Sequence, residues 1–206
     1  MDSTTTQTAG AGLRERKKQE TKQALALTAM RLARERGLEN VRVEDITDAV
    51  NVSRRTFTNY FSSKEEAIAS LSVDRSARAA EALRERPAGE PLADSLAAVF
   101  AVQHEAAAGM DRERIEAIRL LASSPGLLGE HLKTQVEAEG PLAEAIAERT
   151  GIDPRTDPYP HVVAAAVTAA VRAATGHWMT TGAGSLPDLI QRAVRQVAGP
   201  PSTNPR

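Results

Sequence analysis

The side chains best suited to chemistry in this sequence stand in one short stretch, residues 52–68, which reads VSRRTFTNYFSSKEEAI. Arg54 and Arg55 carry guanidinium forks, which bind phosphate or the O6/N7 edge of guanine, and the amide of Asn59 can pair with adenine. Three of the six aromatic residues of the chain lie in the same stretch: Phe57, Tyr60 and Phe61. The first pattern to explain is therefore a group of cations and an amide beside an aromatic cluster.

A helix over residues 53–61 would separate these side chains onto two faces. At 100° per residue the three aromatic residues gather on one side, while Arg55 and Asn59 point the opposite way and Arg54 and Thr58 stand at the flank. We expect the aromatic side to hold the helix against the domain. The polar side then faces outward, where it is equipped to read DNA.

The residues before this helix predict a helix-turn-helix unit. Asn51 is the non-glycine residue type that best tolerates the positive φ of a tight turn, and Ser53 is the expected N-cap of the outward-facing helix. A short helix precedes the turn, and three apolar residues at i, i+3 and i+7 form its inward face: Val43, Ile46 and Val50.

Nearly every segment after residue 13 has helical composition and period, so we expect an all-α fold of about nine helices. The first helix ends before Gly37, and Ser62-x-x-Glu65 and Ser63-x-x-Glu66 both match the signature of a helix start. The expected helices span about 16–36, 43–50, 53–61, 62–87, 91–108, 111–123, 127–149, 161–180 and 186–198.

The net charge of −1 conceals a basic N-terminal part on an acidic remainder. Residues 1–64 carry 12 Lys+Arg against 8 Asp+Glu, and residues 65–206 carry 14 against 19. This split is expected when only the N-terminal part meets a polyanion. The chain has no cysteine, no signal-peptide pattern and no apolar run near the ~18–20 residues that cross a bilayer, so we expect a cytoplasmic protein without a membrane partner.

Catalytic chemistry has little support in this sequence. The four histidines, at 104, 131, 161 and 177, form no H-x-x-x-H pair, and there is no cysteine to act as a nucleophile or a metal ligand. We therefore expect no enzyme activity, no metal and no cofactor.

The stretch VEDITDAVNVSRRTFTNYFSSKEEAI resembles the DNA-binding segment of the TetR family of bacterial regulators. The resemblance covers about residues 16–72. Two positions depart from the family pattern, because Asn51 replaces the turn glycine and Thr58 replaces a usual tyrosine. The matching residues are Ile46, Ala49, Val52, Ser53, Thr56, Phe57, Tyr60, Phe61, Lys64 and Glu65.

The resemblance implies a regulator, most often a repressor, that binds a palindromic operator in double-stranded DNA as a homodimer. Tyr60 and Lys64 would contact phosphate, and the exposed face of the recognition helix would enter the major groove. The DNA-binding residues that we expect are Arg42, Glu44, Ser53, Arg54, Arg55, Thr56, Thr58, Asn59, Tyr60 and Lys64.

The sequence predicts disordered tails at 1–12 and 200–206, and the resemblance implies a DNA-binding domain at 13–72 and an effector-binding and dimerisation domain at 73–199. The alanine-rich segment 161–180 and the aliphatic face of 186–198 would form the dimer as a four-helix bundle.

A small apolar or amphipathic effector would bind within the second domain. The T-F-x-N-Y-F variant is similar to a branch of the family in which some members sense acyl-CoA thioesters, which implies an acyl-CoA-like effector. Candidate lining residues are Phe100, His104, Met110, Arg119, Leu120, Leu121, Leu127, Leu128, His131, His177 and Trp178. Two alternatives remain, a dimeric DNA-binding regulator without a small-molecule ligand and an all-helical enzyme.

Overall fold

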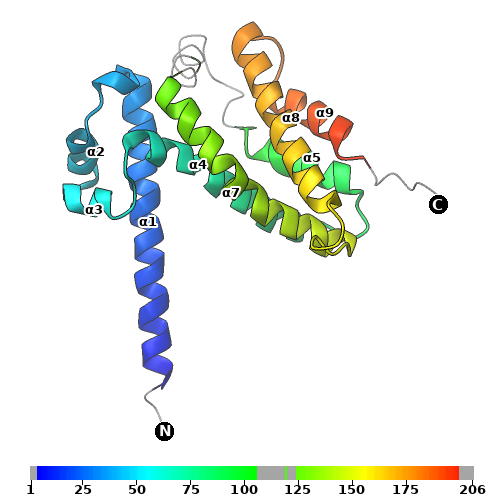
Figure 1. The fold of residues 1–206 in the computed structure, drawn as a ribbon, viewed down its shortest axis with the longest axis horizontal. Coiled ribbons are helices and arrows are strands. Elements are labelled where there is room, and N and C mark those ends of the chain that lie inside the picture. The colour runs from blue at the N-terminus through cyan, green and yellow to red at the C-terminus, as the bar shows by residue number, and fades with distance from the viewer. Residues whose placement is uncertain (1–3, 106–118, 120–123, 200–206) are drawn as a thin grey trace.

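The computed structural model describes residues 4–105, 119 and 124–199, and within these ranges the chain forms helices joined by loops (Figure 1). This is the all-α fold that the sequence predicts. The described part contains eight α-helices and one 3₁₀ helix. Their bounds are α1 Thr4–Arg36, η1 Leu38–Asn40, α2 Val43–Val50, α3 Arg54–Thr58, α4 Lys64–Arg84, α5 Leu92–Val102, α7 Pro125–Thr150, α8 Tyr159–Thr181 and α9 Leu186–Val197.

Several helix ends differ from the sequence prediction: α3 ends at Thr58 where we expected 61, and α5 ends at Val102 where we expected 108. The first helix begins at Thr4, so residues 4–12 are helical where we expected a disordered tail. A helix that is already nucleated extends at little cost, since each added residue makes a backbone hydrogen bond, and this outweighs the poor helix propensity of the threonines and glycines there. The helix expected at 111–123, apart from Arg119, and the tail expected at 200–206 lie outside the described residues.

We call α1, η1, α2, α3 and residues 64–71 of α4 the head. Their apolar side chains share one core, in which Phe57 and Phe61 of the recognition segment meet the buried stripe of α1. One member of this core comes from α7, because Leu127 is only 2% exposed among the head residues. The other members are Leu25, Ala26, Ala29, Leu32, Ala33, Leu38, Val41, Ile46, Ala67, Ile68, Ala69 and Leu71.

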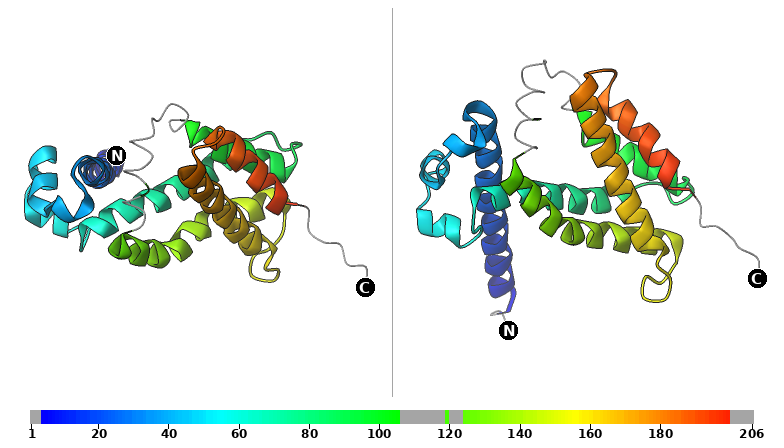
Figure 2. Two further views of the ribbon diagram at one scale, coloured as in Figure 1. Left: turned by 90° about the horizontal axis from the view of Figure 1, so that it is seen from above. Right: turned by 45° about the horizontal axis from the view of Figure 1, so that its top comes forward.

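We call the remainder of α4 together with α5, α7, α8 and α9 the body. Figures 1 and 2 show α4 running from the head into the body with α7 beside it, and α8 and α9 packed on the far side with α5. The body has its own core, which includes Leu83, Phe100, Ile146, Trp178 and Ile190. Since α4 belongs to both cores, it is the continuous connection between the head and the body.

Candidate nucleic-acid interface

The turn before α3 has the geometry that its sequence predicts. Asn51 lies in the left-handed region at φ 57°, the one positive φ found at a non-glycine residue of the described chain. Ser53 then caps α3, since its Oγ accepts a hydrogen bond from the backbone N–H of Thr56 at 3.1 Å. A capped turn of this kind sets the direction in which the short helix leaves α2.

The aromatic residues anchor α3 to the head, as the helical wheel predicts. Phe57 and Phe61 are 1% and 2% exposed, and their ring centroids are 5.7 Å apart. Tyr60 is half-buried, with its ring 6.4 Å from that of Phe61. The ammonium of Lys22 on α1 stands 5.9 Å from the Phe61 centroid, within the range of a cation–π contact. Sequence reasoning missed this contact of Lys22, because it joins α1 to the segment after α3, far along the chain.

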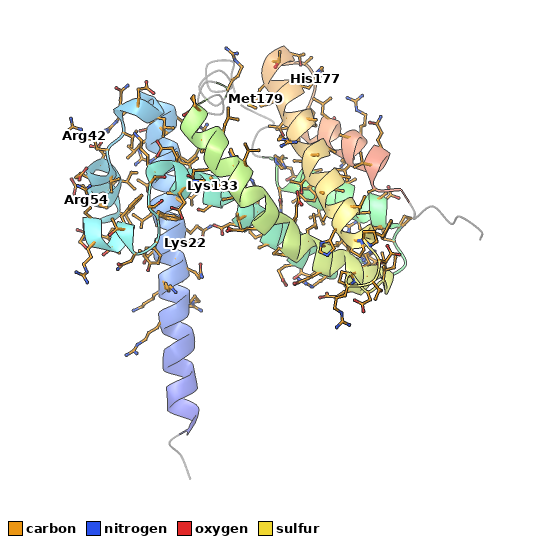
Figure 3. All side chains as sticks on the ribbon, in the orientation of Figure 1. Lys22, Arg42, Arg54, Lys133, His177 and Met179 are labelled. Atoms are coloured by element: carbon orange, nitrogen blue, oxygen red, sulfur yellow. The ribbon has the colours of Figure 1, made fainter. Side chains whose placement is uncertain are left out.

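The opposite face of α3 is exposed. Arg54, Arg55, Thr58 and Asn59 all lie at the surface, and Figure 3 shows Arg42 and Arg54 on the outer side of the head, pointing away from α1. The structure therefore places the cations and the amide together on one surface. We call Arg42, Arg54, Arg55, Thr58 and Asn59 the outer face.

Arg54 and Arg55 differ in their partners. Arg54 Nη1 donates to Glu44 Oε1 at 2.7 Å, which links α3 to α2 across the turn. Both side chains of this pair are more than half exposed, so water screens the attraction and the pair can exchange for a phosphate. Arg55 makes no hydrogen bond or ion pair through its side chain with any residue of the described ranges. Among the guanidinium groups of the outer face, it is the one best placed to donate two parallel hydrogen bonds to a base edge.

The hydroxyls of Thr56 and Thr58 already make hydrogen bonds to neighbouring residues of the recognition segment. Thr58 Oγ1 donates to the backbone carbonyl of Arg55 at 3.0 Å, and Thr56 Oγ1 lies 2.9 Å from Ser53 Oγ. Each oxygen still has a lone pair, so these side chains can accept a hydrogen bond. Arg55 and Asn59 carry exposed N–H groups that can donate to a ligand.

Lys64 has a structural role that sequence reasoning did not predict. Its Nζ donates to the backbone carbonyls of Leu38 and Val41 at 2.6 and 2.7 Å, and the side chain is half-buried. An ammonium has three N–H donors, so one remains for the expected phosphate contact. Sequence reasoning could not find these partners, because they lie 23 and 26 residues away along the chain.

The residues expected to line an effector site are spread through the body. Phe100 and Trp178 are buried in the body core, and Trp178 Nε1 donates to the carbonyl of Gly184 at 3.3 Å. His177 is exposed near the end of α8 (Figure 3), and Arg119 is exposed as well. Leu127 lies in the head core, and Leu128 is 49% exposed. Met110, Leu120 and Leu121 lie outside the described residues.

The structure does bring two expected residues, His104 and His131, near a cation that we did not single out, Arg75 of α4. Burial lowers the pKa of both imidazoles, and the charge of Arg75 lowers each of these pKa values further. Arg75 stands one turn after Leu71 and one turn before Ala79, two buried residues. A cation on an otherwise apolar stripe of a helix is the sequence signal that could have identified it.

Neither a metal site nor a membrane span is evident in the part of the chain that the structure describes. No group of three or more His, Asp or Glu side chains there is placed to hold a metal ion. No helix there combines the length and the apolar character needed to cross a bilayer.

Comparison with known proteins agrees with this arrangement. The sequence model described as "Bacterial regulatory proteins, tetR family" matches residues 26–71, and the model described as "MftR C-terminal domain" matches residues 86–200. The chain is 37% identical over 176 residues to the HTH-type transcriptional regulator TcmR of Streptomyces glaucescens, covering 82% of this chain and 77% of that protein.

A solved structure has the same fold. It is the fatty acid degradation regulator FadR of Bacillus halodurans, at a TM-score of 0.55 and 16% identity, with 88% of this chain and 96% of that chain covered. At this identity the likeness concerns the fold alone.

Proposed function

Because the chain belongs to the TetR family of DNA-binding transcriptional regulators, and so is not an enzyme, we propose that it is a repressor that binds a palindromic operator as a homodimer. A small molecule bound in the body releases it from the DNA. The protein acts in the cytoplasm, where its operator is accessible.

The observation that carries this proposal is the outer face of the head. Arg55 and Asn59 donate to base edges in the major groove, and Arg54 leaves Glu44 for a phosphate or a base. Arg42 and Tyr60 contact the backbone beside the groove, and Ser53 and Thr56 hold the start of α3 at its edge. Lys64 adds a phosphate contact with its remaining N–H.

The second requirement is a dimer, because α3 has only five residues and reads few base pairs by itself. The buried side of α8 belongs to the body core, and its opposite side bears Val162, which is 59% exposed, followed by small side chains. Small side chains let two helices approach closely. This face, together with Leu189, Ala193 and Val197 at the margin of α9, supports dimerisation through a four-helix bundle. The small residues of the α8 face are Ala165, Ala166, Ala169, Ala173 and Gly176.

The test begins with selection of bound fragments from genomic DNA, followed by titration of a selected palindrome with purified protein. Arg55→Ala should weaken operator binding by about 1–3 kcal/mol and relax the preference at one base position in each half-site, because a bidentate base contact is lost. Binding should also weaken steeply as salt is raised.

Arg155→Ala removes one exposed cation far from the head and is the matched control. Its affinity should equal that of the unchanged protein. If Arg55→Ala behaved like this control in both affinity and base preference, the assignment of the outer face would be wrong. Titration of the operator complex with metabolite extracts tests effector release, since a regulator without a ligand would stay bound throughout.

A further inference from the structure

The polar cluster around Arg75 lies where three body helices meet. Arg75 belongs to α4, Gln103 caps the end of α5 and is followed by His104, and His131 lies in the second turn of α7. Gln103 Nε2 donates to the backbone carbonyl of Arg75 at 3.2 Å, which ties the end of α5 to α4. Four polar side chains from three helices therefore converge on one region of the body.

Arg75 combines partial desolvation with accessible surface. Its side chain is exposed by surface area, yet burial by the protein around it lowers the pKa of its guanidinium, with the charge of Arg78 as a smaller cause. The guanidinium is therefore less well solvated than a free surface cation and still accessible to a ligand. The Arg75 guanidinium makes no hydrogen bond or ion pair with the described residues.

Gln103 and His104 supply hydrogen-bond acceptors to this cluster. Gln103 Oε1 is buried and has no hydrogen-bond partner, which is rare for a buried polar atom. His104 Nδ1 lies 2.7 Å from the carbonyl of Phe100, so Nδ1 carries the proton. Because burial disfavours the charged imidazole, His104 Nε2 keeps its lone pair.

Among the described residues of this cluster, the named charges are two cations and one anion. His131 is also held neutral by burial, and Asp74 is the anion whose charge acts on Arg75, while Arg78 adds a second cation. An unpaired guanidinium on α4, with two acceptors at the end of α5 that Gln103 ties to the backbone of Arg75, matches a ligand that carries an anionic group and a hydrogen-bond donor.

We propose that Arg75, Gln103 and His104 bind the carboxylate end of an amphipathic organic anion, with Arg75 holding the carboxylate and Gln103 Oε1 accepting from a hydroxyl or N–H of the ligand. This inference rests on the proposed function, because it names the chemistry of the effector. A neutral apolar molecule would leave the guanidinium and the buried acceptor unsatisfied.

The site also contacts the helices that reach the head. Arg75 is on α4, which runs into the head, and His131 is one turn after Leu127, which is buried in the head core. A ligand that draws Arg75 toward α5 and α7 therefore acts on α4 and α7, the two helices that connect the body to the head. The ligand would release the DNA if it binds best to an arrangement of these helices that holds the two heads of the dimer at a separation unsuited to the operator.

The test uses the anionic fluorescent probe 1-anilinonaphthalene-8-sulfonate with the full-length protein in the absence of DNA. The unchanged protein should bind the probe, octanoate should displace it, and octanamide at the same concentration should not. Arg75→Gln should raise the Kd of the probe at least about tenfold, because a charge-assisted, two-pronged hydrogen bond is lost. Arg155→Gln, the same change at an exposed cation outside the cluster, should alter the Kd by less than about twofold.

Two further variants keep the test decisive if Arg75→Gln is poorly folded. Gln103→Glu places an anion at the buried acceptor with nearly the same shape and should also abolish displacement by octanoate. Arg75→Lys keeps the charge and should retain part of the probe affinity. Equal probe binding by unchanged protein, Arg75→Gln and Gln103→Glu, or equal displacement by octanoate and octanamide, would overturn the proposal.

Operator binding without probe separates this inference from the proposed function. Arg75→Gln should bind the operator as the unchanged protein does, and octanoate should weaken only the unchanged protein's complex. Failure of the unchanged protein to bind any DNA would overturn the proposed function while the anion measurements stayed interpretable.

Discussion

The ammonium of Lys64 joins the start of α4 to the segment that follows α1. Its two hydrogen bonds, to the carbonyls of Leu38 and Val41, are charge-assisted and half-buried, and such bonds are stronger than neutral ones. They fix the angle at which α4 leaves the head. The residue therefore affects how the head is held as well as how it meets phosphate.

We predict that Lys64→Met lowers the free energy of unfolding by about 1–3 kcal/mol, since two hydrogen bonds to a charged donor are lost. Urea denaturation followed by circular dichroism measures this change. Lys133→Met is the matched control, because Lys133 is exposed and pairs only across one turn with Glu130, at 2.7 Å. The control should change stability by less than about 0.5 kcal/mol. A Lys64→Met protein as stable as the control would leave phosphate contact as the only role of Lys64.

At the scale of the helices, α7 is important because it contacts both the body and the head. It packs along α4 within the body, and its first turn inserts Leu127 into the head core. The start of α7 is also close to α4 at Gly126, where an added Cβ would stand 3.2 Å from Cγ of Glu65. The head and the body are therefore joined by two helices rather than by α4 alone.

We predict that Leu127→Ala destabilises the protein by about 2–4 kcal/mol, because it opens a cavity in the head core. Leu128→Ala, at the adjacent and half-exposed position, should cost less than about 0.5 kcal/mol. Amide hydrogen exchange locates the effect, since faster exchange in α1 and α2 is expected only for Leu127→Ala. Unchanged exchange in those helices would show that α7 does not support the head.

At the scale of the whole molecule, the fold keeps the recognition helix apart from the helices that we propose to form the dimer. The head presents one short recognition helix at one end, and α8 and α9 lie in the other half of the molecule (Figure 1). A dimer formed through α8 and α9 would place two heads on one side of the assembly, at a separation set by the body. In such a dimer, a change in the body that altered this separation would alter how well both heads fit successive turns of DNA.

We predict that Val162→Glu dissociates the proposed dimer, because it would place a charge in the apolar contact proposed between two copies of α8. Sedimentation velocity should show a monomer, and operator affinity should fall by at least about tenfold. Leu27→Glu introduces the same charge at another half-exposed apolar position, on α1, and should remain a dimer. A dimeric Val162→Glu protein would place the interface elsewhere.

The sequence by itself determined the class of fold, most helix boundaries and the orientation of α3. Asn51 at the turn, Ser53 at the cap and the aromatic residues on one side of α3 act on neighbours within a few residues, so local rules are sufficient to predict them. The family pattern then indicated which residues of the outer face are suited to DNA.

Only the tertiary structure decided which distant segments meet. The carbonyl partners of Lys64, the insertion of Leu127 into the head core and the convergence of Gln103, His104 and His131 near Arg75 all join residues far apart in the chain. Helical period shows which side of each helix is apolar, but every helix of this chain has such a side. Which of these sides pack together depends on the path of the loops and the fit of the side chains, and neither is encoded in a short window of sequence.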